Sequence, residues 1–256
     1  MNGTAAGVPY VALPPADASG HDTVVVAYHL LGDPQTEEAF ADAVPLTGLN
    51  AWRLYFGLPM SGKRLPRGGL EELIMEDAVR NVHRHVTLGA LEEFPAAFAA
   101  AKEQLGIRDA TRVGVMGGSM GGAVAQLVLA EGGVDITAAV LINPVVQFRN
   151  SIDALSRRHG QPYAWSAETD AVADRLDFVR RAADLRGAAI RFITGADDMV
   201  DAIIEPVSRA VPALETAGAT VDWQVVPEMA HAVTSQAARV DSLASEWFAA
   251  KLTNPA

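Results

Sequence analysis

The residues most suggestive of chemistry are a serine and the glycines around it, Gly117-Gly118-Ser119-Met120-Gly121-Gly122. An apolar run typical of a strand, 112–116, precedes them, and an alanine- and leucine-rich run typical of a helix, 123–130, follows them. A serine on a tight turn between a strand and a helix exposes its hydroxyl for attack on an acyl carbon, an arrangement called a nucleophile elbow. Glycines two residues before and after it give the strand and helix room to meet. The pattern therefore predicts Ser119 as a nucleophile.

A glycine-rich turn before a helix has two other interpretations, a plain tight connection or a phosphate-binding loop. The chain has no G-x-x-x-x-G-K-[ST] pattern, and its glycines are spaced G-G-x-x-G rather than the G-x-G-x-x-G of dinucleotide-binding turns. The nucleophile is therefore the favoured interpretation.

Two groups that could assist a serine nucleophile follow later strands. Asp198 comes after an apolar run at 189–193, and His231 comes after another at 221–226. The carboxyl ends of parallel strands form the edge of a sheet at which ligands bind. At that edge His231 could accept the proton of Ser119, and Asp198 could orient the imidazole and stabilise the imidazolium. Ser119, Asp198 and His231 are the predicted catalytic residues, and their chain order is one that a nucleophile elbow uses.

These residues need a scaffold that brings strand ends together. Short apolar runs bounded by turn residues predict strands at 8–13, 23–27, 51–56, 112–116, 138–142, 189–193 and 221–226. Helical patterns alternate with them at 36–44, 91–105, 123–131, 200–217 and 235–251. The alternation predicts an α/β fold with a mostly parallel, doubly wound central sheet of about seven to eight strands.

We expect one domain over residues 1–256, since that length suits a single large domain. Residues 58–81 predict a long loop that runs into a charged stretch at 71–84. Residues 145–186 are longer than an ordinary strand connection and carry helical patterns, so they predict a small cap or lid inserted within the domain.

The serine turn, the later acid and histidine, and the alternating elements together resemble the α/β-hydrolase fold serine hydrolases, an esterase- and peptidase-like superfamily, over almost the whole chain. The resemblance implies an oxyanion hole made by the backbone N–H groups of Met120 and Leu31. In that family the second of these N–H groups follows a histidine-glycine turn at the end of an early strand. This chain has His29-Leu30 there, with leucine in place of the glycine, so the N–H of Leu30 is the alternative to that of Leu31.

The acid has competitors in its own loop. Similar hydrolases carry the acid three residues after a glycine, as Gly195 and Asp198 are spaced, and this favours Asp198 over the alternative Asp197. Asp201 is expected to lie at the start of a helix and to complement its dipole.

Four residues are candidates for substrate contacts: His29, Leu30, Phe148 and Trp165. Phe148 and Trp165 could line a pocket under the cap, although core packing explains them equally well. His29 has a second interpretation, in which its ring bonds the backbone of its loop and is purely structural.

Five other polar residues are candidate binding groups. Lys63, Arg64 and Arg67 form a basic cluster that either recognises a carboxylate or phosphate or is a solvated loop. His83 and His85 are spaced as metal ligands on a strand could be, but no carboxylate or cysteine pattern joins them. We expect them to be surface or half-buried residues near a loop.

Composition limits the partners. The chain has 20 basic and 31 acidic residues, a formal charge of −11, so a nucleic-acid partner is not expected. It has no cysteine, which removes disulfides, thiolate metal sites and a cysteine nucleophile. No signal peptide or membrane-length apolar run is visible, so we expect a cytoplasmic protein with no membrane partner. No motif implies a metal or organic cofactor, and a homo-oligomer is compatible with the sequence.

The predicted function is hydrolysis of an ester-type acyl bond of a small molecule through an acyl-enzyme. Peptidase or amidase, thioesterase and acyltransferase activities on the same residues are the alternatives. An alternative of another class is a catalytically idle scaffold that binds a ligand or partner.

Overall fold

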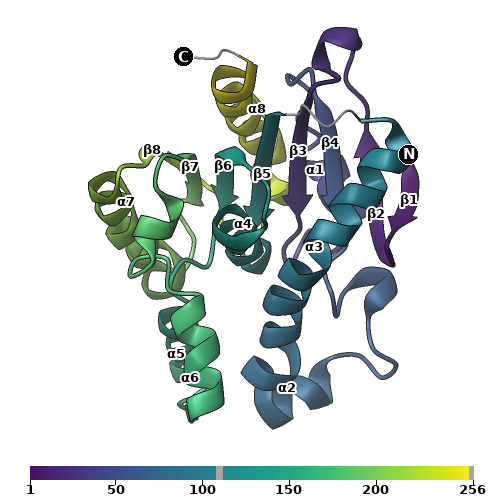
Figure 1. The fold of residues 1–256 in the computed structure, drawn as a ribbon. Coiled ribbons are helices and arrows are strands. Elements are labelled where there is room, and N and C mark those ends of the chain that lie inside the picture. The colour runs from purple at the N-terminus through teal and green to yellow at the C-terminus, as the bar shows by residue number, and fades with distance from the viewer. Residues whose placement is uncertain (108–111, 254–256) are drawn as a thin grey trace.

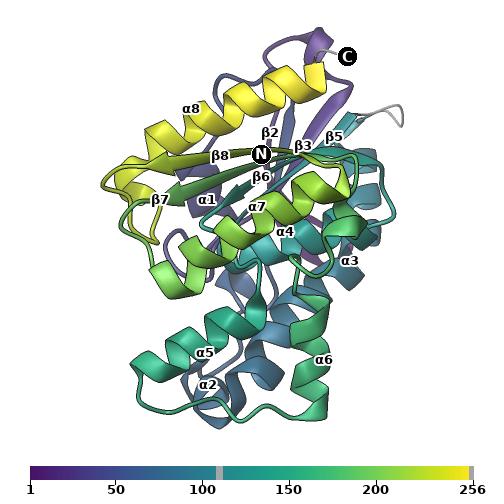
Figure 2. The same cartoon turned by 90° about the vertical axis from the view of Figure 1, so that its left-hand side faces the viewer.

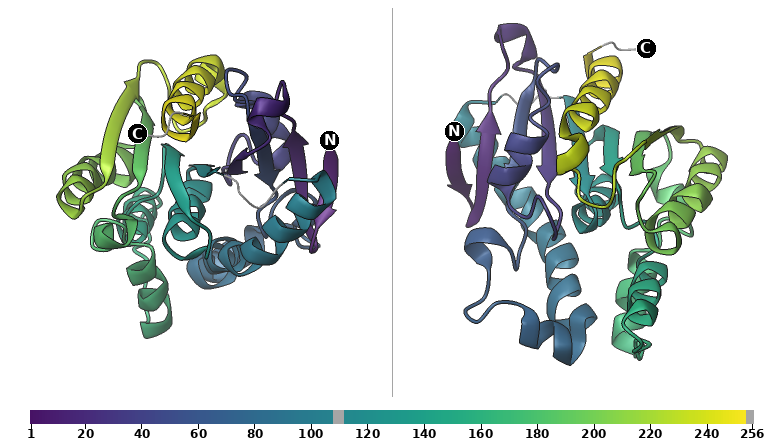
Figure 3. Two further views of the ribbon diagram at one scale, coloured as in Figure 1. Left: turned by 45° about the horizontal axis from the view of Figure 1, so that its top comes forward. Right: turned by 180° about the vertical axis from the view of Figure 1, so that it is seen from behind.

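A computed structural model describes residues 1–107 and 112–253, and within them eight strands form one sheet. The strands are β1 (Asn2–Ala5), β2 (Val8–Leu13), β3 (Thr23–Tyr28), β4 (Trp52–Phe56), β5 (Arg112–Gly118), β6 (Ile136–Ile142), β7 (Ala189–Gly195) and β8 (Thr220–Val226). Their order across the sheet is β1-β2-β4-β3-β5-β6-β7-β8. Strand β2 pairs antiparallel with both β1 and β4, and all other neighbouring pairs are parallel. The predicted α/β fold and strand number are confirmed. Figure 3 shows the N-terminal and C-terminal strands at opposite edges.

Helices cover both faces of the sheet. They are α1 (Glu37–Ala43), α2 (Glu71–Ala78), α3 (Arg84–Leu105), α4 (Met120–Glu131), α5 (Phe148–Arg158), α6 (Ala167–Arg175), α7 (Glu205–Ala217) and α8 (Ala237–Phe248). The buried residues of α1 and α8 share one hydrophobic cluster, and those of α3, α4 and α7 share the other. Figure 2 shows α8 on one side of the sheet and α3, α4 and α7 on the other.

The central strands are apolar along their whole length because both of their faces are covered. Every residue of β3 is buried, and successive side chains point to opposite faces. Val24 and Val26 accordingly belong to the cluster of α3 and α4, whereas Val25 and Ala27 belong to the cluster of α1 and α8.

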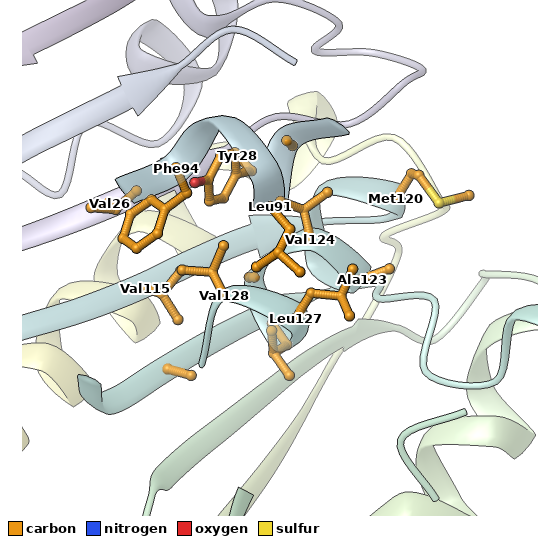
Figure 4. Close-up of a cluster of buried hydrophobic side chains, with 14 of the residues drawn as sticks. Val26, Tyr28, Leu91, Phe94, Val115, Met120, Ala123, Val124, Leu127 and Val128 are labelled. Atoms are coloured by element: carbon orange, nitrogen blue, oxygen red, sulfur yellow. The ribbon is translucent and has the colours of Figure 1, made fainter. Parts of the chain in front are cut away.

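Helix α4, which follows the serine turn, is held in the core. Its Leu127 and Val128 are fully buried, and Figure 4 shows them beside Val115 of β5 and Leu91 and Phe94 of α3. Burying an aliphatic side chain of this size stabilises a fold by roughly 1.5–3 kcal/mol. The start of α4 is therefore fixed by packing along the rest of the helix.

Three helices lie beyond the carboxyl ends of the strands, α5 and α6 from residues 145–186 and α2 from the segment before α3 (Figure 1). Arg80 and Arg84 both form ion pairs with Glu168 at the start of α6, with N···O distances of 3.1 and 3.0 Å. The hydroxyl of Tyr163 donates to Asp77 over 2.6 Å. The two excursions are thus joined by side-chain contacts.

The segment 58–81 differs from the loop that the sequence predicted, because it contains α2. Ile74 and Met75 of this helix are 48% and 80% exposed, so α2 buries little apolar surface. Periodicity arises from burial, and an exposed helix shows little of it.

No helix in residues 1–107 and 112–253 has both the length and the apolar character that crossing a lipid bilayer requires.

Candidate active site

Ser119 lies directly after β5 in a strained conformation, with φ 51° and ψ −116°. Two glycines make the turn possible. A Cβ atom on Gly117 would lie 2.1 Å from the carbonyl oxygen of Gly121, and one on Gly121 would lie 2.2 Å from that of His29. The N–H of Ser119 donates to Ile142 over 2.9 Å. Close backbone packing and this bond hold the serine in a conformation that non-glycine residues rarely adopt.

His231 lies in the loop after β8, within hydrogen-bond distance of the serine. Its Nε2 is 2.8 Å from Oγ of Ser119. Its Nδ1 is 3.1 and 3.0 Å from the two carboxylate oxygens of Asp198. An ionised carboxylate only accepts hydrogen bonds, so Nδ1 carries the proton and Nε2 is free to accept one from Ser119. The structure thus brings the three predicted catalytic residues together from the ends of three strands.

Of the three neighbouring aspartates, Asp198 is the one whose carboxylate meets the imidazole of His231. The side chain of Asp198 is fully buried, and it also accepts from the N–H of Met199 over 2.6 Å. Asp197 is exposed. Asp201 lies in the first turn of the helical segment Val200–Ile204 and forms an ion pair with Arg158. Only Asp198 of these three contacts the imidazole.

Asn143, directly after β6, ties the loops of the site together and was missed by the sequence analysis. Its side-chain N–H groups donate to the carbonyls of Ala230 and His231, both over 3.0 Å. Its side-chain oxygen accepts from the N–H of Gly195 over 2.8 Å. One amide therefore connects the end of β7 with the histidine loop. An asparagine directly after a buried strand was the available signal.

The N–H groups of Leu31 and Met120 belong to residues that line the same cavity as Ser119. Neither donates a hydrogen bond to another group in the described part of the chain. Met120 is the first residue of α4, where the helix dipole favours negative charge. Both amides are therefore available to an anion beside Ser119.

The cavity has a volume of about 110 Å³. Its polar lining residues are Ser119, His231, His83 and Ser151. Its apolar lining residues are Leu31, Met120, Val145, Phe148, Ile152, Leu155, Met199, Ala202 and Ile203. No carboxylate or cationic side chain lines it among the residues that the structure describes. The site therefore suits an uncharged group.

Of the four predicted substrate contacts, only Phe148 lines the cavity. Trp165 packs edge-on against Phe148, with ring centroids 6.4 Å apart, and does not reach the cavity. Leu30 is fully buried, and its side chain fills the space beside Gly118, where a Cβ would lie 2.3 Å from its Cδ1. Leu30 is thus corrected from a substrate contact to a packing residue, and Trp165 lies outside the lining of this cavity, where it packs against Phe148.

His29 fits its structural interpretation rather than a substrate contact, because its ring is fully buried. Its Nε2 accepts from the N–H of Leu58 over 3.1 Å, and its Nδ1 bonds the carbonyl of Leu30. Burial lowers the pKa of His29 to about 4, so the ring is neutral at physiological pH. Its place is structural: it holds the loop that carries Leu31 against the loop after β4.

The basic cluster is paired internally and does not line the cavity. Lys63 contacts Glu38 over 2.7 Å, and Arg64 contacts Glu93 over 2.8 Å. Arg67 is exposed. These contacts favour the solvated-loop interpretation. Within the described ranges, no group of three or more His, Cys, Asp or Glu side chains could hold a metal ion.

Comparisons with known proteins identify the family and the fold of the chain. The family model of the prolyl oligopeptidase family matches residues 79–254, a range that holds Ser119, Asp198 and His231. No curated protein matches the sequence. The solved structures described below are under 25% identical to this chain, so they establish the fold alone.

Three of them illustrate the range. The protein TT1662 from Thermus thermophilus is 20% identical with a TM-score of 0.72, and the match covers 96% of each chain. The acylaminoacyl peptidase of Pyrococcus horikoshii is 12% identical with a TM-score of 0.68, and the match covers 97% of this chain but 40% of the peptidase. A dienelactone hydrolase from Anabaena variabilis is 17% identical with a TM-score of 0.56, with 98% of each chain covered.

Proposed function

The chain belongs to the prolyl oligopeptidase family and is a serine hydrolase with the α/β-hydrolase fold, and on that premise we propose that it cleaves an ester-type acyl bond of a small molecule with Ser119 as nucleophile. One observation carries the proposal. Oγ of Ser119 lies 2.8 Å from Nε2 of His231, and Nδ1 of the same imidazole lies 3.0 Å from the buried carboxylate of Asp198.

The proposed reaction has two halves. As Ser119 Oγ attacks the ester carbonyl, His231 Nε2 takes the hydroxyl proton, and Asp198 stabilises the resulting imidazolium. The carbonyl oxygen becomes an oxyanion, which accepts hydrogen bonds from the N–H groups of Met120 and Leu31. His231 then gives its proton to the departing alcohol oxygen, which leaves an ester on Ser119. Water, losing a proton to His231, attacks this ester, and His231 returns a proton to Ser119 Oγ as the bond to the acyl carbon breaks and the acid leaves.

The cavity lining favours a small uncharged ester over a peptide with a free amino terminus. An ammonium group needs a carboxylate or several acceptors when it is removed from water. No carboxylate lines the cavity among the described residues. A peptidase or amidase activity remains the second candidate, supported by the family match over residues 79–254.

Active-site labelling with a fluorophosphonate tests the nucleophile. We expect the probe to modify Ser119, located by mass spectrometry of the labelled peptide, and to leave Ser119→Ala unlabelled. The exposed Ser208 offers a matched control, because Ser208→Ala removes a serine away from the cavity and should keep full labelling. A folded wild-type protein that does not react would instead favour the idle scaffold.

A substrate panel then separates the two candidate activities. Short-chain p-nitrophenyl esters should be turned over with a higher kcat/KM than aminoacyl p-nitroanilides. A higher kcat/KM for the anilides would favour amidase over esterase activity, and Ser119 would remain the proposed nucleophile.

A further inference from the structure

His83 is the cavity residue that the proposed reaction does not use. It ends the short helical segment Val79–His83, which leads into α3, and its ring lines the same cavity as Ser119 and His231. The ring packs edge-on against Phe148 of α5, with centroids 5.5 Å apart and an angle of 75° between the planes. It is therefore held in place by an aromatic contact in the wall of the cavity.

The imidazole of His83 has no hydrogen-bond partner in the described part of the chain. Its Nδ1 is buried without one, and no bond is formed by Nε2. Buried polar groups nearly always have a partner, supplied by protein, water or ligand. A half-buried imidazole with two unused nitrogens at a cavity wall is thus open to a bond from the cavity's occupant.

The other polar side chains of the cavity are already engaged. Ser119 and His231 bond each other. Ser151 donates its hydroxyl proton to the carbonyl of Ala202 over 2.7 Å. An oxygen on a bound substrate, outside its reacting carbonyl, therefore finds one lining side chain with an unengaged N–H donor among the described residues, which is His83.

The size and charge of the cavity define what that substrate group is. An engineered apolar cavity of about 150 Å³ holds a benzene molecule. The cavity here, of about 110 Å³, therefore suits a substrate group smaller than benzene, such as a short aliphatic chain. Burial lowers the pKa of His83 to about 4, so its ring is neutral and offers one donor and one acceptor. A neutral hydroxyl or ether oxygen fits such a ring better than a carboxylate.

We propose that His83 determines the specificity of the site by hydrogen-bonding a neutral oxygen on the substrate, so that the preferred ester is a short one carrying a hydroxyl or ether group. This inference rests on the proposed function, since it names the substrate of the same serine. His83 acts in binding and positioning, and takes no part in proton transfer.

Matched ester pairs test the preference in the wild-type protein. On the acyl side, p-nitrophenyl 3-hydroxybutyrate is compared with p-nitrophenyl butyrate. On the alcohol side, 3-hydroxybutyl butyrate is compared with butyl butyrate in a pH-stat. A typical net hydrogen bond predicts a kcat/KM ratio of about tenfold in favour of the hydroxylated ester in at least one pair. Ratios near one in both pairs overturn the proposal.

Two variants then assign the preference to His83. His83→Phe keeps an aromatic ring against Phe148 but has no nitrogen, so it should lose the preference by raising KM for the hydroxylated ester. His83→Gln keeps a donor and an acceptor and should retain part of it. A His83→Phe protein that still prefers the hydroxylated ester overturns the proposal.

The test keeps the two proposals distinguishable. If Ser119 reacts with the fluorophosphonate and the ester pairs show no preference, only the role of His83 fails. If Ser119 does not react in the folded protein, the proposed function itself fails.

Discussion

The side-chain amide of Asn143 donates a hydrogen bond to the backbone carbonyl of His231 over 3.0 Å. The same amide group also bonds Ala230, and its oxygen bonds Gly195. The backbone of the histidine loop is therefore held by a side chain whose own hydrogen bonds, in the described part of the chain, go to neither the serine nor the acid. Asn143 is a positioning residue for the proposed reaction.

Removing this amide should lower turnover while leaving Ser119 in place. Asn143 has a φ of 43°, so Asn143→Gly removes the side chain without adding backbone strain, whereas Asn143→Ala does both. We expect both variants to lower kcat, and Asn143→Ala to have the lower melting temperature. Steady-state kinetics and thermal unfolding measure this. If Asn143→Gly has the kcat of the wild type, the loop that carries His231 keeps its position without the Asn143 side chain, and the prediction is wrong.

The two neighbouring aspartates should behave in opposite ways. Asp198→Asn places an amide against Nδ1 of His231 and favours the wrong tautomer, so kcat should fall by about 10⁴-fold. Asp197→Asn changes an exposed side chain and should leave kcat within about twofold of the wild type. Equal losses in both variants would contradict Asp198 as the acid.

Gly121 and Gly89 provide a pair of alanine substitutions with opposite expected signs. A Cβ on Gly121 would lie 2.2 Å from a backbone oxygen that cannot move aside, so Gly121→Ala should destabilise the fold by about 3 kcal/mol or more. Gly89 lies within α3 with its nearest neighbour at 3.5 Å, an ordinary contact. Gly89→Ala should stabilise the fold by about 0.5–1 kcal/mol. Urea unfolding of both variants gives the two free energies.

Stability should depend on pH through His29. Its pKa is about 4 in the folded protein, below the ordinary value of 6.5, so between these values the unfolded chain binds more protons. The free energy of unfolding therefore has its full His29 contribution above pH 6.5, and loses it as pH falls toward 4. The slope is at most about 1.4 kcal/mol per pH unit for one group.

The variant His29→Gln isolates this contribution. Urea unfolding at several values between pH 4 and 7 should show a shallower dependence for His29→Gln than for the wild type. His159 is exposed, so its surroundings change little on unfolding, and His159→Gln should keep the wild-type dependence. Parallel curves for the wild type and His29→Gln would mean that the ring is not buried in its neutral form.

The central strands were predictable because burial on both faces leaves a continuous apolar run, as in β3. Two elements were not predicted, because they bury little apolar surface. β1 is an edge strand in which Ala5 alone is buried, and α2 exposes Ile74 and Met75. Neither element therefore has a periodic pattern of apolar residues that would predict it.

In the site, Ser119, Asp198 and His231 stood out because each follows a strand and has a residue type that the chemistry requires. Asn143 bonds two loops and His83 lines the cavity only because distant segments pack together. Spacing along the chain does not reveal such packing. The burial of His29 and Leu30 depends on packing in the same way. Spacing alone therefore left a substrate contact open for both, whereas in the structure both are fully buried and outside the cavity lining.

The contacts between Glu168 and the two arginines Arg80 and Arg84 have a consequence for how selectivity can evolve. All three side chains are nearly half exposed, and exposed ion pairs contribute at most about 1 kcal/mol each. The reacting groups, by contrast, follow strands whose packing carries much of the stability. Substitutions in the outer helices can therefore reshape which molecules enter while the chemistry beneath stays intact, so new specificities are accessible to this scaffold at small thermodynamic risk.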